Sequence, residues 1–347
     1  MRAAVLRRTG ITIDEIERPT PGPGQVLARV LANGLCGTDQ HLINHRAEPA
    51  DLNYPGWGSL DLDSGVVLGH EWAVEIAATG DGVNGWAPGA RAVGRSRIPH
   101  HNPTRTDGFV SVGFSSLYPG AYGEYILLTA DLLKPLPDSV PSHVAATIQP
   151  SGIARHAVTL AALQQDEPVV ILGGGPIGLT VLLWLMREGA GPIAVIDPIA
   201  SRRKLAQSIG AAWADAPDAP DAPDLATRVN ALDGSAPRLI FDCAGARGTI
   251  QSAMDLAARD ARIIILGING GLDELRPIVG IGKHLTLQFS QGYNETDELE
   301  TIAAFGDGSM DTSPIITRTL SLDELPDYLL HADQSVDCKA VLAFPKT

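Results

Sequence analysis

The sequence predicts an α/β protein with a doubly wound parallel sheet over about residues 150–291, preceded by a β-rich segment. The first observation is that short apolar runs alternate with helical segments in the second half of the chain, the order that a parallel sheet requires. The second is a glycine-rich turn directly after one such run. The third is that apolar residues stand among charges and turn residues over 1–35, which is typical of β-strands.

Short apolar runs, bounded by turn residues, give the expected parallel strands: Pro168–Leu172, Ile193–Ile196, Leu239–Asp242, Arg262–Leu266 and Lys283–Phe289. The intervening helices include Ile177–Arg187, which Gly189 ends, and Ala200–Ile209, which Gly210 ends. Pro168–Met186 is apolar enough to suggest a membrane span, but consecutive glycines and a proline interrupt it. We therefore expect strand, turn and helix there, and no membrane partner.

The turn after the first of these strands carries the G-x-G-x-x-G pattern, formed by Gly173, Gly175 and Gly178, with Pro176 and Ile177 opening the helix. Glycines at the first two positions let the backbone turn tightly and approach a pyrophosphate at the positive end of the helix dipole. The third glycine lets the helix lie close to the strand. The pattern predicts a bound dinucleotide.

Asp197 ends the second strand of this unit and supplies the acid expected about 20 residues beyond the glycines. Its carboxylate is suited to accept hydrogen bonds from a ribose 2′-hydroxyl and to repel a 2′-phosphate, which favours NAD. Arg202 and Arg203 follow within a turn and leave the use of NADP open.

The composition narrows the class of protein. A formal net charge of -14 disfavours nucleic acid or an anionic membrane as partner. The chain has 3 cysteines without close spacing, which fits a reduced, cytoplasmic setting. The N-terminus carries no apolar secretory region, so no export is expected.

Cys36, His70 and Glu71 are the candidate metal ligands. A thiolate, an imidazole and a carboxylate are ligand types that zinc accepts, and a catalytic zinc keeps one position open. Each residue also has a structural interpretation: a buried small hydrophobe, a satisfied core histidine and a surface acid. The three gain weight together, because they precede a dinucleotide-binding segment.

The chain resembles the medium-chain, zinc-dependent alcohol dehydrogenases over nearly its whole length. The matching pieces are GLCGTDQH at 34–41, LGHE at 68–71, AYGEY at 121–125, GGGPIG at 173–178 and Asp197. The resemblance implies a GroES-like β-domain formed by residues 1–149 and 292–347, a Rossmann domain formed by residues 150–291, and a catalytic zinc.

The resemblance also implies roles for individual residues. Cys36 and His70 match zinc ligands, Glu71 matches an acid at or behind the metal, and Gln149 falls at the fourth metal position. Asp39 matches a residue that orients His70. Thr38 and His41 match a relay that carries the alcohol proton toward solvent. The expected cofactor-binding set is Gly173, Gly175, Pro176, Ile177, Gly178, Asp197, Arg202, Cys243 and Gly267.

The chain departs from the family pattern in several places. Gln149-Pro150 is similar to the pair in archaeal glucose dehydrogenases, but Ser111 and Ile153 stand where sugar-binding residues are expected, which disfavours glucose. A four-cysteine structural zinc lobe is missing, since no cysteine lies between Cys36 and Cys243, and His100 and His101 cannot rebuild one. The long interval from Cys36 to His70 indicates an insertion in the loop 42–65, interpreted as a surface excursion.

We therefore predict an NAD(P)-dependent oxidoreductase that interconverts a secondary alcohol, such as a sugar or polyol, and its carbonyl with one catalytic zinc. Loop residues that are candidates to face a polyhydroxy substrate are Asn53, Asp61, Arg95 and His101. Two alternatives remain: a zinc-free reductase of an activated double bond, and a non-catalytic NAD-binding protein. Apolar strands at 262–268 and 285–289, with the resemblance, favour a homodimer or homotetramer.

Overall fold

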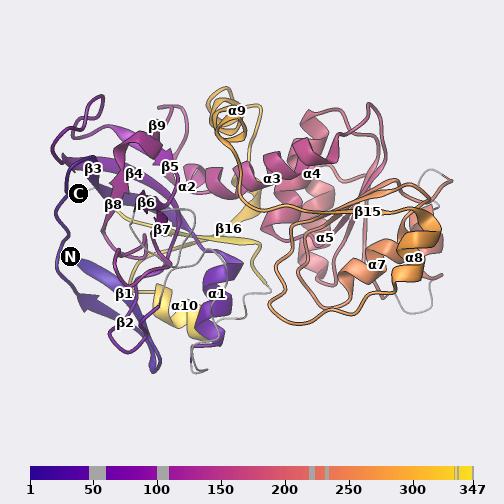
Figure 1. Ribbon diagram of the computed structural model, residues 1–347, viewed down its shortest axis with the longest axis horizontal. Helices are drawn as coiled ribbons and strands as arrows, with labels where there is room; N and C mark the ends of the chain where they lie inside the picture. Colours follow the sequence, from indigo (N-terminus) through magenta and orange to yellow (C-terminus); the bar gives the residue numbers. More distant parts are fainter. Residues whose placement is uncertain are drawn as a thin grey trace. The chain divides into compact units, whose positions relative to one another are not determined.

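The structure is a computed structural model of the 347-residue chain, drawn as a ribbon in Figure 1. It describes residues 1–46, 60–99, 109–218, 223–230, 234–331, 333 and 336–345. The chain divides into two compact units. Unit 1 comprises Met1–Gln149 and Ile316–Thr347, and unit 2 comprises Pro150–Ile315.

Unit 1 is a β-domain, and its described residues form one mixed sheet of seven strands. In sheet order these are β16 (Ile316–Leu320), β17 (Lys339–Ala343), β3 (Gln25–Gly34), β4 (Glu71–Thr79), β5 (Arg91–Gly94) and β9 (Leu133–Pro135), with β8 (Tyr125–Thr129) also paired to β3. Two further antiparallel pairs are β1 (Arg2–Arg7) with β2 (Gly10–Glu15), and β6 (Arg97–Pro99) with β7 (Phe109–Ser111). The predicted β-rich N-terminal domain is confirmed.

Strand β3 is the centre of unit 1, because β4, β8 and β17 all pair with it in antiparallel register. Val26, Ala28 and Val30 of this strand are fully buried in an apolar core that also contains residues of β4 and β8. Gly34 at its end pairs with Glu71 on one side and Val341 on the other. The end of β3 therefore lies between the start of β4 and the C-terminal strand.

Helical segments of unit 1 are α1 (Gly37–Asn44), η1 (Ala130–Leu132), α2 (Ser142–Ala145) and α10 (Leu325–His331). The interpretation of 42–65 as a surface excursion is wrong at its described ends. Leu42 and Ile43 belong to α1 and pack in a core cluster with Leu325 of α10, and Leu62 is buried in the same cluster. The prediction fails because Leu42 and Ile43 are apolar neighbours at the end of a helix that packs against α10. Residues 47–59 of that loop, including Asn53, lie outside the described residues.

Unit 2 has a parallel sheet of six strands within its described residues, in the order β12 (Trp213–Asp215), β11 (Ile193–Ile196), β10 (Val169–Leu172), β13 (Leu239–Asp242), β14 (Arg262–Ile265) and β15 (Thr286–Phe289). Every residue of β10, β11 and β13 is buried, as the apolar runs predicted. The chain order reverses between β10 and β13, and ligands bind beside the carboxyl ends of strands at such a switch point.

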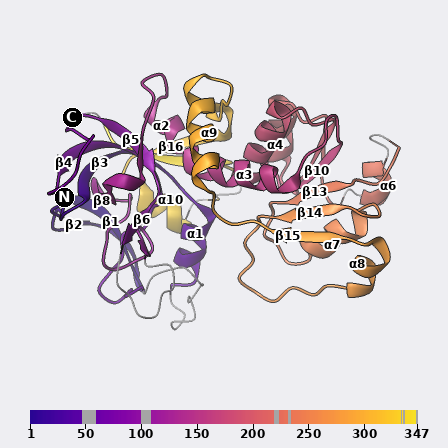
Figure 2. The same ribbon diagram turned by 45° about the horizontal axis from the view of Figure 1, so that its top comes forward.

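Helices cover both faces of this sheet, so the doubly wound architecture is confirmed. Figure 2 shows α4 (Pro176–Arg187) on one face and α7 (Thr249–Leu256) on the other. The remaining helical segments of the unit are α5 (Ala200–Ile209), α6 (Leu225–Asn230), α8 (Pro277–Lys283), α9 (Glu295–Gly306) and η2 (Ser313–Ile315), and α3 (Ile148–Ala161) runs across its first boundary.

The second boundary between the units differs from the expected one. The family resemblance predicts that residues 292–347 belong to the β-domain, but residues 292–315 belong to unit 2, which ends at Ile315. Helix α9 is held to α3 by a histidine–carboxylate hydrogen bond and by an ion pair. Asp297 accepts from His156 Nδ1 at 2.8 Å, and Glu300 accepts from Arg155 Nε at 2.7 Å. Local periodicity does not reveal these contacts between distant helices, so the sequence pattern does not indicate that α9 belongs to unit 2.

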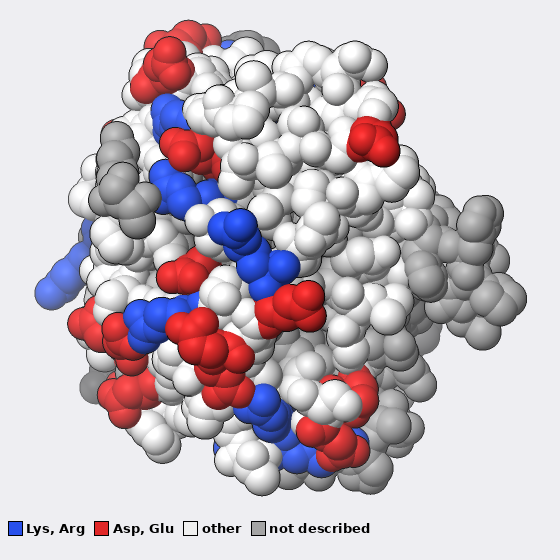
Figure 3. All heavy atoms as spheres, turned by 90° about the vertical axis from the view of Figure 1, so that its left-hand side faces the viewer, with Lys and Arg blue, Asp and Glu red and all other residues white. Residues whose placement is uncertain are grey.

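Charged side chains of both signs alternate on the face of the molecule drawn in Figure 3. Ion pairs within unit 1 include Arg7 with Asp14 at 2.7 Å and Arg29 with Glu75 at 3.1 Å. Both pairs are only partly exposed. Among the described residues, no helix has the length and apolar character needed to cross a membrane.

Candidate functional site

The pairing of strands β3 and β4 brings the candidate metal ligands together in unit 1. Gly34 at the end of β3 faces Glu71 at the start of β4, so Cys36, two residues beyond Gly34, lies next to His70 and Glu71. The side chain of Asn33 holds the first residue of β4 in place, since Asn33 Oδ1 accepts a hydrogen bond from the Glu71 backbone N–H at 3.1 Å. Cys36 is also the residue directly before α1, at its N-cap position.

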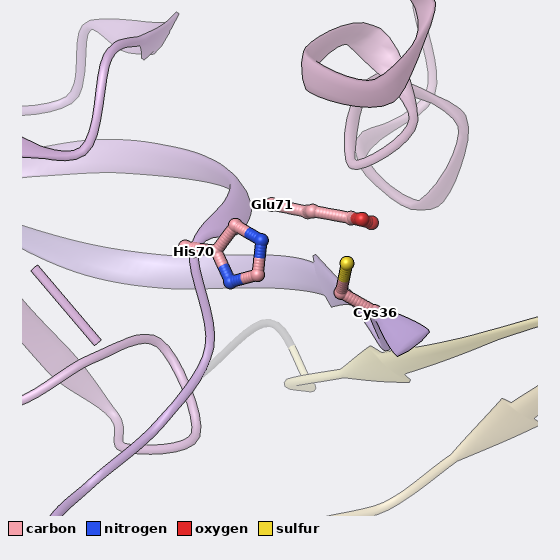
Figure 4. Close-up of side chains that lie close together, drawn as sticks. All are labelled: Cys36, His70 and Glu71. Carbon is pink, nitrogen blue, oxygen red and sulfur yellow. The ribbon is translucent and has the colours of Figure 1, made fainter. Parts of the chain in front are cut away.

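The three side chains point toward one another, as Figure 4 shows. One potential ligand atom from each of Cys36, His70 and Glu71 lies within 4.8 Å of the other two. Glu71 is buried, and Cys36 and His70 are half-buried. Thr38, in the first turn of α1, donates its hydroxyl hydrogen to Cys36 Sγ over 3.0 Å. The sequence motifs therefore converge on one sulfur–nitrogen–oxygen cluster.

Asp39 lies behind His70. Its Oδ1 is 3.4 Å from His70 Nδ1, and its Oδ2 accepts a hydrogen bond from the Tyr122 hydroxyl at 2.9 Å. The ring of Phe114 covers the imidazole, with 4.6 Å between the ring centroids. Burial by itself lowers the pKa of His70, but the Asp39 carboxylate and the Cys36 thiol group outweigh it and hold that pKa well above the ordinary value.

Glu71 has a partner that the sequence analysis missed. The ammonium group of Lys339, on β17, donates to Glu71 Oε2 and also to the carbonyl oxygen of Leu35 at 2.8 Å. Burial lowers the pKa of Lys339, but the charges of Glu71 and Cys36 more than compensate and raise it. The carboxylate of Glu71 therefore already has a basic partner on one side.

Glycine at position 34 makes room for this pair. A Cβ there would lie 2.2 Å from Glu71 Oε2, 2.9 Å from Lys339 Cε and 3.2 Å from the carbonyl oxygen of Ala146. Ala146 directly follows α2, and Gln149 lies in the first turn of α3 immediately afterwards with its side chain half-buried. The chain segment that carries Gln149 thus adjoins the Glu71–Lys339 pair.

The donor set fits a divalent zinc ion. Thiolate sulfur, imidazole nitrogen and carboxylate oxygen are the ligand types of catalytic zinc sites, and three protein ligands leave a position for substrate. His70 Nδ1 and Asp39 Oδ1 are buried and, within the described residues, have no hydrogen-bond partner elsewhere. Each is therefore available to the other, the carboxylate–imidazole pairing that commonly supports a metal-binding histidine.

His41 lies near the end of α1, one turn beyond Thr38. Its ring stacks on that of His45, with 4.1 Å between the centroids and 32° between the planes. The carbonyl oxygen of His41 accepts a hydrogen bond from His45 Nδ1 at 2.8 Å, so Nδ1 of His45 carries a hydrogen. The two residues expected to relay a proton, Thr38 and His41, are on the same helix as Asp39.

In unit 2, the glycine-rich turn joins β10 to α4 as predicted. Gly173 has φ of +96°, and a Cβ on Gly178 would lie 1.8 Å from the carbonyl oxygen of Gly173, so both positions require glycine. At Gly175 the nearest atom to a Cβ would be Arg202 Nη1 at 3.8 Å, which leaves open space above the turn. Pro176 begins α4, with Ile177 next. The turn therefore presents backbone N–H groups to a space that a pyrophosphate can enter.

Asp197 lies beside this turn and uses both carboxylate oxygens locally. Oδ2 accepts from the Gly174 backbone N–H at 2.8 Å, and Oδ1 accepts from the Ile199 backbone N–H at 2.7 Å. Arg202 Nη1 is 3.9 Å from Asp197 Oδ2. The backbone thus holds the Asp197 carboxylate in place, and the Arg202 guanidinium group lies near both this carboxylate and Gly175.

Cys243 and Gly267 follow β13 and β14 at the same carboxyl edge of the sheet. The backbone of Cys243 and Ala244 comes so close to Gly173 that a Cβ there would lie within 3.0 Å of both residues. Burial and the charge of Asp242 raise the pKa of the Cys243 thiol well above its ordinary value. The cofactor-binding residues predicted in unit 2 therefore gather at one edge of its sheet. His100 and His101 lie outside the described residues.

Two family models match the chain. One, the alcohol dehydrogenase GroES-like domain, covers residues 22–138, and the other, zinc-binding dehydrogenase, covers residues 176–306. A GroES-like β-domain with a sulfur–nitrogen–oxygen cluster, followed by a parallel dinucleotide-binding sheet, defines a zinc-type dehydrogenase. The chain belongs to the medium-chain, zinc-dependent alcohol dehydrogenase family.

Individual proteins are similar along the whole chain. An L-threonine 3-dehydrogenase of Rhizobium rhizogenes is 28% identical over 324 residues, which are 91% of this chain and 90% of that protein. The 2R,3R-butanediol dehydrogenase of Bacillus subtilis has the same fold, with a TM-score of 0.85, 23% identity and 99% of each chain covered. A protein of Sinorhizobium meliloti 1021, described as a zinc-binding dehydrogenase and bound to NADP, superimposes with a TM-score of 0.84, 25% identity and 99% of each chain covered.

Proposed function

We propose that this dehydrogenase oxidises a secondary alcohol, such as a sugar, a polyol or a related compound, to its carbonyl with NAD(P), and catalyses the reverse reaction. The observation that carries the proposal is the convergence of Cys36, His70 and Glu71 within 4.8 Å in a domain of the zinc-dependent family. When bound, zinc supplies a Lewis acid for the substrate hydroxyl and the nicotinamide accepts the hydride.

In this proposal Cys36 and His70 hold a single catalytic zinc, with Glu71 or Gln149 as the third protein ligand. The Lys339 ammonium group competes with the metal for Glu71, because both are attracted to the same carboxylate. Gln149 offers a neutral amide oxygen, a weaker ligand than a thiolate or carboxylate. We expect zinc to bind less tightly here than in a site with two thiolates, and no structural zinc, since no cysteine lies between Cys36 and Cys243.

The proton of the alcohol is taken by Thr38 and passed to His41. A hydroxyl group both accepts and donates a hydrogen bond, and histidine exchanges protons near neutral pH. The position of Thr38 supports this role, because its hydroxyl group is 3.0 Å from Cys36 Sγ, one of the atoms that would hold the zinc. His41 is about one helical turn away on α1, within the same element.

NAD is the proposed cofactor, and NADP is the proposed alternative cofactor. The anchored Asp197 carboxylate favours a ribose hydroxyl and opposes a 2′-phosphate. Arg202 supplies a positive charge 3.9 Å from that carboxylate, which reduces the electrostatic repulsion of a 2′-phosphate. The remaining cofactor-binding residues are Gly173, Gly175, Pro176, Ile177, Gly178, Cys243 and Gly267.

The substrate class is inferred from a relative and from the loops. L-threonine 3-dehydrogenase is named for a substrate with a secondary hydroxyl group, which agrees with the proposed chemistry.

We place the enzyme in the cytoplasm. A homodimer or homotetramer is supported by the exposed apolar side chains around the edge strand β15, where Phe289 is 65% and Ile278 of α8 is 70% exposed.

The test compares Cys36→Ser with Cys338→Ser, the same substitution outside the proposed machinery. We expect Cys36→Ser to lose bound zinc and turnover of secondary alcohols while NADH binding, measured by fluorescence titration, is retained. Cys338→Ser should keep all three. Wild-type turnover in Cys36→Ser would overturn the zinc step, and reduction of enones by the metal-free enzyme would favour a zinc-free reductase instead.

A further inference from the structure

Tyr122 joins the two parts of unit 1 that carry the proposed metal ligands. It lies in the turn before β8 and is 2% exposed. Its hydroxyl donates to Asp39 Oδ2 at 2.9 Å, and Asp39 is fully buried in the first half of α1. The tip of the tyrosine is thus fixed to the helix that follows Cys36.

The backbone of the same tyrosine is fixed to the segment that ends in His70. Tyr122 N–H donates to the carbonyl oxygen of Leu68 at 2.9 Å, and the N–H of Ala121 donates to the carbonyl oxygen of Gly69 at 2.9 Å. Gly69 has φ of +97°, and a Cβ there would lie 2.8 Å from Cδ1 of the Tyr122 ring. Only a glycine before His70 lets the ring pass to Asp39.

The hydrogen bond decides which oxygen of Asp39 faces the imidazole. A carboxylate has two oxygens in one plane, so a bond that holds Oδ2 on Tyr122 also sets the direction of Oδ1. That oxygen is 3.4 Å from His70 Nδ1. With Nδ1 directed at Asp39, the imidazole has Nε2 left for the cluster with Cys36 and Glu71.

Packing alone does not account for the hydroxyl group. A phenylalanine would fill the same space, and a buried hydroxyl is unfavourable unless it finds a hydrogen-bond partner. Tyr328 provides a comparison within unit 1, because it is also buried and donates to a carboxylate, Asp337 Oδ2, at 3.1 Å. Asp337 also accepts from Arg318 and lies outside the metal cluster.

We propose that Tyr122 is a positioning residue for the metal centre: its hydroxyl orients Asp39, and Asp39 in turn presents His70 to zinc. This inference rests on the proposed zinc-dependent function. It assigns to the tyrosine of the AYGEY segment a purpose beyond core packing. Removal of the hydroxyl leaves every proposed ligand in place but frees the Asp39 carboxylate to rotate.

The test uses Tyr122→Phe, with Tyr328→Phe as the matched control that deletes another tyrosine–carboxylate bond in the same unit. Metal-free proteins are titrated with zinc against a chromophoric chelator, and their urea unfolding is measured in parallel. We expect Tyr122→Phe to weaken zinc binding about 10-fold, at the low end of the range for residues that support metal ligands. Tyr328→Phe should bind zinc like the wild type.

The Co²⁺-substituted proteins give a second readout. We expect the thiolate-to-cobalt and d–d absorption bands to shift in Tyr122→Phe, because the imidazole ligand is less well oriented, and to be unchanged in Tyr328→Phe. If Tyr122→Phe fails to fold, Asp39→Asn tests the same connection, because a neutral amide cannot replace the carboxylate acceptor; it should weaken zinc binding about 10- to 100-fold.

The outcomes separate the two hypotheses. Wild-type protein that binds no zinc contradicts the proposed function itself. Suppose that the wild type binds zinc and that Tyr122→Phe has the same zinc affinity and the same cobalt spectrum. This result overturns the positioning role, even if both tyrosine variants lose similar stability. Weaker zinc binding confined to Tyr122→Phe supports it.

Discussion

Lys339 and Glu71 form an ion pair across 268 residues of sequence, and their side chains are 3% and 2% exposed. The lysine comes from the C-terminal strand β17 and the glutamate from the start of β4, and β3 lies between these strands in the sheet. A buried carboxylate beside a thiol and an imidazole requires a positive charge nearby. In the metal-free protein Lys339 provides that charge.

Replacing Lys339 by Met should therefore destabilise the metal-free protein strongly. Loss of one partner leaves a buried charge uncompensated, and we expect a decrease of about 3 kcal/mol or more in the free energy of unfolding, measured with urea. Saturating zinc should reduce the loss, because the metal supplies another cation for Glu71. Arg29→Met, which breaks the more exposed pair with Glu75 in the same sheet, should cost less than about 1 kcal/mol. Equal losses in the two variants would contradict the role of Lys339.

Gly34→Ala should disturb the same pair without removing a charge. The added methyl group would lie 2.2 Å from Glu71 Oε2, and backbone pairing on both sides restricts any shift of β3. We expect a loss of about 1–3 kcal/mol of stability and weaker zinc binding. Gly37→Ala is the control, because a Cβ there meets nothing within 4 Å. An unperturbed Gly34→Ala variant would show that the carboxylate can move freely.

Much of the fold was predictable because its signals are local. The strand, glycine turn, helix and acid between Pro168 and Asp197 are continuous in sequence, and β10, α4 and β11 form there. Cys36 and His70 lie in short motifs at the ends of strands that pair directly. Lys339 gave no signal, since its contact with Glu71 exists only after β17 has joined β3. Likewise, Tyr122 belongs to the AYGEY motif, but the motif does not reveal its hydrogen bond to Asp39, because that bond depends on the turn at Gly69.

Gly175→Ala should separate cofactor binding from folding. The nearest atom to the new Cβ would be 3.8 Å away, an ordinary contact, so stability should stay at the wild-type value. The methyl group would occupy the space that a pyrophosphate needs, and we expect the Kd for NADH to rise about 10-fold, or about 1.4 kcal/mol. Fluorescence titration with NADH and urea unfolding provide the two measurements.

Gly178→Ala is the contrasting variant. Its Cβ would lie 1.8 Å from the carbonyl oxygen of Gly173, so the turn itself must shift. We expect this variant to lose about 1–3 kcal/mol of stability as well as NADH binding. If Gly175→Ala bound NADH as tightly as the wild type, the turn would not be the pyrophosphate site.

Stability at alkaline pH should report on Tyr328. Burial, followed by the charge of Asp337, raises the pKa of its phenol to about 12 in the folded protein. A raised pKa means that the folded state favours the neutral phenol. The resulting stability is present below the unfolded value of about 10 and is lost as the pH rises toward 12.

Tyr328→Phe removes that group, so the difference in unfolding free energy between wild type and variant should narrow between about pH 9 and about pH 11. Tyr122, whose pKa is also raised by burial, is present in both proteins and does not affect the comparison. A difference that stays constant over this range would show that the Tyr328 phenol titrates alike in the folded and unfolded chains.

The insertion of β17 between β16 and β3 has a consequence for biosynthesis. Every described strand of the parallel sheet lies between residues 169 and 289, so the ribosome delivers unit 2 complete while the β-domain still lacks its last strand. The nascent β-domain carries Glu71 from early in translation, but the lysine that pairs with it arrives only with residue 339. A messenger truncated shortly before that codon would yield an intact unit 2 attached to a β-domain that has an exposed sheet edge and a Glu71 without its lysine partner.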